Sequence, residues 1–260
     1  MATIPAKVLA RLKAEVPKFQ KILESAHDRD VNEADTVVIV TDMLEQVFGM
    51  DKYSEVTREY AIKSTFVDLA VKIDGKLEYL IEVKAIGHEL KDLHLRQAIN
   101  YAAHEGVRWV VLTNGISWEV HRVMVSGQIT NEQAMAFNFL ELSTRRQSDL
   151  EMLFLLCRRG LAKNLIEDHF ERQQACNKFT IGALLGSEPV VSTVRKLLRQ
   201  MNPGLKVTPE EIKEIVETQV LKREVQNSEQ GVEAQKKVGR ALARQTKKPA
   251  PKSQVEPTAE

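Results

Sequence analysis

Apolar residues at helical spacing dominate the first part of the chain. They recur every three or four positions over 5–26, which predicts a helix. A second helix is predicted over 36–48, and Gly49 is suited to end it. The β-branched run that opens this segment is typical of a strand. The helical spacing continues through Leu44 and Val47, however, and favours the helix.

The period of the pattern then changes to two. Apolar and polar residues alternate over 66–73 and 77–84, which predicts two strands, and a weaker alternation near Tyr60 marks a further strand before them. Asp74 and Gly75 between the two clear strands are a strong hairpin signal. The apolar residues of both strands have odd numbers, so a plain two-residue turn would place one apolar set in water. The sequence therefore predicts a three-residue connection or a bulge near Gly75.

The pattern after the hairpin predicts a helix over 92–105, a buried strand over 107–112 and a further strand over 118–125. Helices and strands in this order predict an α/β fold in which a mixed central sheet is flanked by helices. Beyond about residue 130 the pattern becomes helical. The expected helices are 150–164, 165–177, 192–201 and a last one over 208–225, which Thr208 begins with a capping sequence.

These patterns divide the chain into three parts. A core with its N-terminal helix is expected over 1–130, and a helical region over 131–226. The last part, 227–260, loses its apolar pattern, so we expect a basic and largely disordered tail.

Composition changes this picture only locally. The formal net charge is +1, which gives no argument for nucleic-acid binding by bulk charge. Aromatic residues are sparse at 5%, which argues against stacking platforms for single strands. Any basic surface must therefore be local, and its expected source is the tail, with Lys236, Lys237, Arg240, Arg244, Lys247, Lys248 and Lys252.

The sequence also bears on the compartment. Its N-terminus is charged and amphipathic, unlike a signal peptide, and no apolar run approaches the ~20 residues that span a bilayer. Cys157 and Cys176 lack metal-type spacing and are interpreted as buried free thiols in a reducing compartment. We therefore expect a cytoplasmic protein that does not associate with membranes.

Three polar residues on the predicted hairpin carry the candidate chemistry. In the corrected register Asp68 lies opposite or close to Glu82, and Lys84 follows on the same face. Phosphodiester hydrolysis needs a divalent ion held by hard oxygen ligands, which the two carboxylates supply; the backbone carbonyl of Val83 could add another. Lys84 could orient the attacking water or stabilise charge on the phosphate. The alternative is a salt bridge on a solvated edge strand.

The segments 66–70 (FVDLA), 79–85 (YLIEVKA) and 97–102 (QAINYA) together resemble the PD-(D/E)XK nuclease superfamily. More narrowly, they are similar to the N-terminal nuclease domain of the type I restriction enzyme R subunit. The segment 110–118 (VVLTNGISW) is similar to that family's strand, Thr-Asn-Gly turn and tryptophan. The resemblance covers roughly 31–124 and implies a restriction-endonuclease-like core.

The resemblance also implies roles for individual residues. Asp68 and Glu82 are expected to bind the metal, and Lys84 is expected to assist catalysis. Gln97 and Tyr101 match a Gln-x-x-x-Tyr helix motif whose glutamine points at the site, and their spacing places them on one helix face. The family further places an acidic residue on the first core helix. Glu33 is our candidate for that residue, with Asp35 as the alternative.

The family implies a metal-dependent DNA endonuclease that uses Mg²⁺, or Mn²⁺, in restriction-modification, phage defence or DNA processing. We expect a stand-alone nuclease without the helicase motor of the R subunit, because the 260 residues are too few for that motor and contain no Gly-x-x-x-x-Gly-Lys-Ser/Thr segment. Two alternatives stay open: a nucleic-acid-binding module without useful turnover, and a module that recruits partners. A homodimer or a partner protein, bound through the helical region, is a further expectation.

Overall fold

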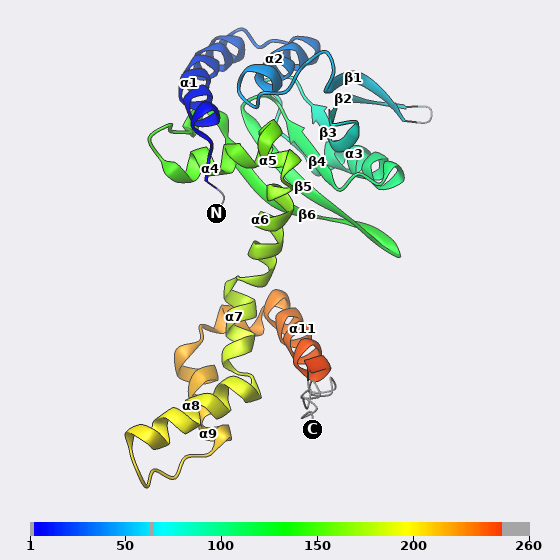
Figure 1. Cartoon of the computed structure of the whole chain (residues 1–260). Helices are drawn as coiled ribbons and strands as arrows, with labels where there is room; N and C mark the ends of the chain where they lie inside the picture. Colours follow the sequence, from blue (N-terminus) through cyan, green and yellow to red (C-terminus); the bar gives the residue numbers. More distant parts are fainter. Residues whose placement is uncertain (1–2, 63–64, 246–260) are drawn as a thin grey trace, which may run out of the picture. The chain divides into compact units, whose positions relative to one another are not determined.

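The computed structural model describes residues 3–62 and 65–245. Within these residues, six strands form one sheet in the order β1-β2-β3-β4-β5-β6 (Figure 1). Neighbouring strands are antiparallel except β3 and β4, which are parallel. The fold is therefore α/β with a mixed sheet, as predicted. The strands are β1 (Val56–Ile62), β2 (Thr65–Ile73), β3 (Lys76–Val83), β4 (Trp109–Thr113), β5 (Ser117–Ser126) and β6 (Gln128–Asn138).

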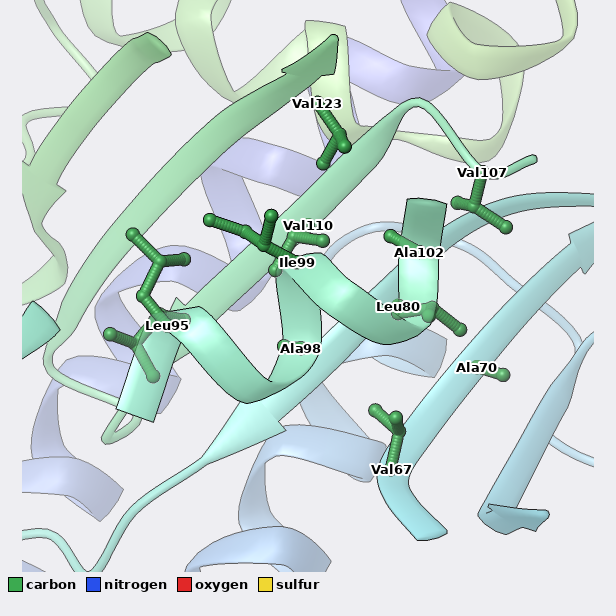
Figure 2. Packing of buried hydrophobic residues seen from close by; sticks show 11 residues of the cluster. Val67, Ala70, Leu80, Leu95, Ala98, Ile99, Ala102, Val107, Val110 and Val123 are labelled. Atoms are coloured by element: carbon green, nitrogen blue, oxygen red, sulfur yellow. The ribbon is translucent and has the colours of Figure 1, made fainter. Parts of the chain in front are cut away.

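Helix α3 (Asp92–Glu105) connects the two parallel strands and covers one face of the sheet. Its apolar side packs on β3, β4 and β5, where Leu80 and Val110 are fully buried beneath Ala98 (Figure 2). Burying a side chain such as leucine or valine contributes about 1.5–3 kcal/mol. The helix ends at Gly106, which adopts the left-handed conformation with φ of 67°.

The opposite face of the sheet lies against the N-terminal helices. The predicted helices are present as α1 (Ala6–Asp28) and α2 (Glu33–Gln46), and Gly49 has the positive φ expected after a helix end. Tyr79 points to the face opposite Leu80, as successive strand residues do. Its hydroxyl lies 3.5 Å from the sulfur of Met50, which follows α2.

The β2–β3 hairpin contains the bulge that the odd-numbered apolar pattern requires, but not within the turn. Asp74 and Gly75 form a two-residue turn with φ of 50° and 80°, which pairs Ile73 with Lys76. The register then shifts, so that Glu78 has no opposite partner. Beyond the bulge the apolar residues of both strands share one face, as predicted.

The boundary expected near residue 130 is wrong. Strand β6 crosses it, and the chain divides instead into two compact units, Met1–His169 and Phe170–Glu260. The strand escaped the pattern analysis because the first six of its residues are exposed and polar ones dominate there. Such an edge strand buries little, so its sequence lacks the alternation of a half-buried strand.

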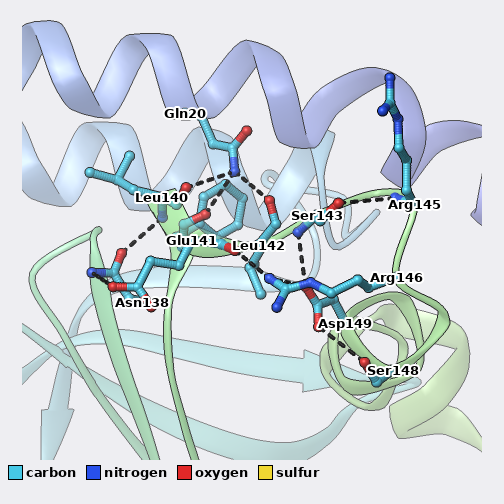
Figure 3. A network of polar contacts seen from close by, with 11 residues as sticks. Gln20, Asn138, Leu140, Glu141, Leu142, Ser143, Arg145, Arg146, Ser148 and Asp149 are labelled. Carbon is cyan, nitrogen blue, oxygen red and sulfur yellow. Dashed lines mark hydrogen bonds and ion pairs between the residues drawn. The ribbon is translucent and has the colours of Figure 1, made fainter.

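The last part of the first unit is helical. The predicted helix over 150–164 is divided into α4 (Gln147–Leu156) and α5 (Arg158–Ala162), because Cys157 has an extended backbone with ψ of 150°. A short helix, η1 (Phe139–Glu141), precedes them. Gln20 of α1 donates from its amide nitrogen to the carbonyls of Phe139 and Leu142 at 3.1 and 2.8 Å (Figure 3). These bonds fix α1 to the segment that leaves the sheet.

The second unit is helical. Its elements are α7 (Lys178–Leu185), α8 (Glu188–Met201), α9 (Pro209–Ile215), the π-helix η2 (Val216–Val220), α10 (Arg223–Asn227) and α11 (Glu229–Gln245), and α6 (Leu165–Ala175) leads into it. The capping box predicted at Thr208 is present. The predicted helix over 208–225 is interrupted, and α7 is an additional helix.

The expectation of a largely disordered tail needs correction, because α11 occupies 229–245. The rest of the tail, 246–260, lies outside the described residues. Of the two cysteines, Cys157 is buried as expected, but Cys176 is exposed. Across 3–62 and 65–245, no helix is both long and apolar enough to cross a bilayer.

Candidate active site

Two carboxylates from neighbouring strands meet at the end of the β2–β3 pair. The register that pairs Leu69 with Ile81 brings Asp68 beside the next residue of β3, Glu82. The backbone N–H of Val83 donates to Oδ2 of Asp68 at 2.7 Å, which fixes the aspartate at this end of the strand pair. Glu82 is 7% exposed, which is rare for a glutamate without a special environment.

Lys84 joins this pair from the residue after β3. Its Nζ lies 2.9 Å from Oε1 of Glu82 and 3.3 Å from Oε2 of Glu33. Glu33 is the first residue of α2 and follows the cap residue Asn32, whose side chain accepts from the N–H of Asp35. Of the two acidic candidates on α2, Glu33 is therefore the one that contacts Lys84.

Burial sets the electrostatics of the two carboxylates. It raises the pKa of Asp68, although the N–H of Val83 and the charge of Lys84 oppose the rise. Burial and then the negative charge of Asp68 raise the pKa of Glu82, against the stabilising effect of Lys84. Both ionised groups are thus less stable here than in water, and a further positive charge between them would be favourable.

Lys84 remains a cation in this environment. Burial lowers the pKa of its amine, but the carboxylates of Glu82, Glu33 and Asp68 outweigh burial and raise it overall. The side chain therefore offers a fixed positive charge and three donors at neutral pH, rather than a base.

A cavity of about 560 Å³ opens beside the ion pair. Glu82 and Lys84 line it from the strand side, and Gln97 and Tyr101 line it from α3. The amide nitrogen of Gln97 donates to the hydroxyl of Tyr101 at 2.9 Å. The structure therefore brings Glu82 and Lys84 to the same cavity as the two residues of the Gln-x-x-x-Tyr helix motif, whereas Asp68 is not among the residues that line it.

Three more polar residues of α3 line the same cavity and were not predicted as site residues: His94, Arg96 and Asn100. The Nδ1 of His94 is buried and has no hydrogen-bond partner among the described residues. Burial, and then the charges of Lys84 and Lys91, lower the pKa of His94. The spacing of these residues from Gln97 and Tyr101 places them on adjoining parts of one helix surface, a signal that the sequence contained.

Asn114 holds the loop that leaves Lys84. Its side-chain nitrogen donates to the carbonyls of Ile86 and His88 at 3.2 and 2.8 Å. Its side-chain oxygen accepts from the N–H groups of Ile116 and Ser117 at 3.1 and 2.7 Å. One buried amide thus joins the turn after β4 to the segment after β3, which positions the start of that segment at the site.

The described residues contain no group of three histidine, cysteine, aspartate or glutamate side chains that could hold a metal ion. The donors at this site are instead two carboxylates and the adjacent backbone. Mg²⁺ is commonly bound in this way, through one or two carboxylates together with waters and substrate phosphates. The donor set of Asp68 and Glu82 therefore fits a hard divalent cation that is completed by substrate.

Comparisons of the chain with models of known protein families, with curated proteins and with solved structures find no match. The function is therefore inferred from the side chains of the site.

Proposed function

We propose that this chain is a metal-dependent nuclease that hydrolyses DNA phosphodiester bonds, with a restriction-endonuclease-like core. The observation that carries the proposal is the meeting of Asp68, Glu82 and Lys84 at one end of the β2–β3 strand pair, beside a cavity lined by Gln97. Two carboxylates can hold a divalent cation, and a lysine beside them can stabilise the charge that develops during phosphodiester hydrolysis.

Asp68 and Glu82 would hold Mg²⁺ or Mn²⁺, together with the carbonyl oxygen of Val83. When bound, the ion lowers the pKa of a coordinated water and polarises the phosphoryl group. The raised pKa values of both carboxylates support this assignment, because they mark a place where negative charge lacks compensation.

The side chains around this pair supply position and charge. Lys84 keeps its proton and can donate to a phosphate oxygen, where negative charge develops as the bond breaks. Its two ion pairs limit the directions that the ammonium group can take. Gln97, exposed on α3, can donate or accept at the other wall of the cavity, so we assign it to orienting the water or the substrate.

A purely structural ion pair accounts less well for this cluster. Removing Glu82 and Asp68 from water disfavours both charges, and the pair with Lys84 does not restore the ordinary pKa of either carboxylate. A structural role would be met as well by apolar residues that continue the strand. Perturbed carboxylates beside a cavity are instead typical of functional sites.

The test is cleavage of supercoiled plasmid and of single-stranded DNA by the purified full chain, with Mg²⁺, with Mn²⁺ or with EDTA. We expect cleavage with either metal and none with EDTA. Glu82→Ala should reduce the rate by about 10²-fold or more, because a metal ligand and the partner of Lys84 are lost together. Glu89→Ala is the matched control, since Glu89 is an exposed acid in the loop after β3. Its rate should equal that of the native chain.

Cleavage that survives Glu82→Ala unchanged would show that this site is not responsible. Salt-sensitive DNA binding without cleavage by the native chain would favour the alternative, a nucleic-acid-binding module that keeps the nuclease fold.

A further inference from the structure

The two compact units carry opposite charge. Residues 1–169 contain 21 basic and 25 acidic side chains, a formal charge of −4. Residues 170–260 contain 16 basic and 11 acidic side chains, a formal charge of +5. The unit with the candidate site therefore repels a polyanion overall, and affinity for DNA has to come from local cations or from the other unit.

Helix α11 concentrates cations of the second unit on one of its sides. Lys236, Arg240 and Arg244 follow one another at intervals of four residues, which places them along one side of the helix at steps of about 6 Å. Lys237 lies beside them. These four residues, here called the α11 stripe, are all exposed.

The other side of α11 is buried. Ala234 and Val238 are 7% and 8% exposed, and the helix packs along α7 (Figure 1). The rotation of about 100° per residue places both of these residues about 160° around the helix from Lys236, and Val238 at the same angle from Arg240. The stripe therefore faces solvent because the apolar side of the helix is occupied within its own unit.

None of the four cations forms an ion pair with a carboxylate within the described part of the chain. Glu233, the nearest acid of the same helix, precedes the stripe by one turn. Four neighbouring positive charges without partners repel one another, and a polyanion would relieve that repulsion.

We propose that the α11 stripe binds the phosphate backbone of duplex DNA, the substrate of the nuclease proposed above, on which this inference rests. The stripe spans about 12 Å, over which a duplex presents about seven phosphate charges. Recognition of this kind reads charge and not base sequence.

Two other polyanionic partners fit the stripe less well. Proteins that bind single strands without sequence preference stack bases on aromatic side chains, and 170–260 contains only Phe170 and Phe179 as aromatic residues. A membrane-surface helix inserts an apolar face between lipids, but the apolar side of α11 is packed on α7. The stripe offers charge alone, which suits a duplex.

The experiment measures binding of the full chain to a fluorescent DNA duplex in EDTA, at a series of potassium chloride concentrations. In the stripe variant, Lys236, Lys237, Arg240 and Arg244 are all replaced by glutamine, which has a similar helix propensity. The slope of log K against log salt should fall in magnitude by about 3 to 4, since each phosphate contact contributes about 0.9. At low salt the affinity should fall at least about tenfold.

The control variant replaces Arg172, Lys196, Arg199 and Lys206 by glutamine. These residues are exposed cations of the same unit, so the control loses the same charge from other surfaces. Its slope should stay close to that of the native chain. Circular dichroism of both variants checks that the helices are retained. A chain that carries only Lys236→Arg and Lys237→Arg should bind as the native chain does, because charge is what the contact requires.

Equal slopes for the native chain and the stripe variant would overturn the inference, and so would an equal loss in both variants. A stripe variant that binds DNA normally but no longer binds anionic lipid vesicles would overturn it in favour of a membrane surface. If the native chain nevertheless cleaves DNA in a Glu82-dependent way, each of these outcomes rejects DNA binding by the α11 stripe but not the proposed nuclease function. If it neither binds nor cleaves DNA, the proposed function fails as well.

Discussion

The ionised side chains of Asp68 and Glu82 lower the stability of the folded chain. Burial raises the pKa of both carboxylates, so each ionised form is less stable in the folded chain than in the unfolded chain. This contribution is unfavourable at a pH above the raised pKa, and it disappears as the pH falls through that value and below the ordinary one. The Val83 N–H and Lys84 offset only part of the cost.

Replacing Asp68 by asparagine should therefore stabilise the chain in EDTA at pH 7. The amide oxygen can still accept from the N–H of Val83, while the buried charge is removed. We expect a gain on the order of 1 kcal/mol, or about 2–4 °C in melting temperature. The gain should vanish as the pH approaches the ordinary aspartate value of 3.8, because native Asp68 is then protonated.

Thermal melts of the native chain and Asp68→Asn between pH 4 and pH 7.5 measure this difference. A gain that grows as the pH falls would contradict the electrostatic account. So would a large loss of stability at neutral pH.

At the residue scale, the sequence was enough to predict some side-chain positions but not others. The apolar residues of both hairpin strands have odd numbers, and side chains alternate with a period of two. These two facts were enough to predict that Asp68 lies beside Glu82. The choice between Glu33 and Asp35 could not be made in the same way. The two residues lie about 200° apart around α2, and which one reaches Lys84 depends on how that helix packs.

At the scale of elements, the turn after β4 is more than a connection. Asn114 is 7% exposed and makes four hydrogen bonds, two of them to carbonyls of the segment after β3. A short amide side chain that hydrogen-bonds the backbone two residues on is typical of a turn. The bonds to the carbonyls of Ile86 and His88 also hold the loop that begins at Lys84 in place.

Asn114→Ala should destabilise the chain by about 2–3 kcal/mol, since buried backbone groups would lose their partners. The activity should fall as well, because the loop after Lys84 would lose its anchor. Urea denaturation measures the first effect and the plasmid assay the second.

Asn100→Ala is the control for stability. Asn100 is exposed on α3, so its replacement should change the unfolding free energy by no more than about 0.5 kcal/mol. If Asn114→Ala were equally mild, the anchoring role would be refuted.

Helices and strands with a clear local sequence signal could be predicted, and those with a weak hydrophobic pattern could not. Helix α3 ends at Gly106 and α9 begins with the Thr208 capping box, both as expected. Strand β6 was missed because an edge strand buries few side chains. Helix α11 was missed because much of its packed side is made of small residues such as Gly231 and Ala234, which a hydrophobic pattern hardly registers.

At the scale of the whole molecule, average properties conceal the division of the chain. A net charge of +1 gives no sign that one unit carries −4 and the other +5. The unit boundary at His169 was equally hidden, since it falls within helix α6 and helices lie on both sides of it. A boundary within a helical region is set by which helices pack on the sheet, and this is a tertiary property.

Cation binding by the full chain tests the central claim, that Asp68 and Glu82 form a divalent-metal site, most directly. Titration with Mn²⁺ in a calorimeter, without DNA, should show binding that Asp68→Asn and Glu82→Gln each abolish and that Glu89→Gln leaves intact. A native chain that binds no cation, or binding that both site variants retain, would contradict the account.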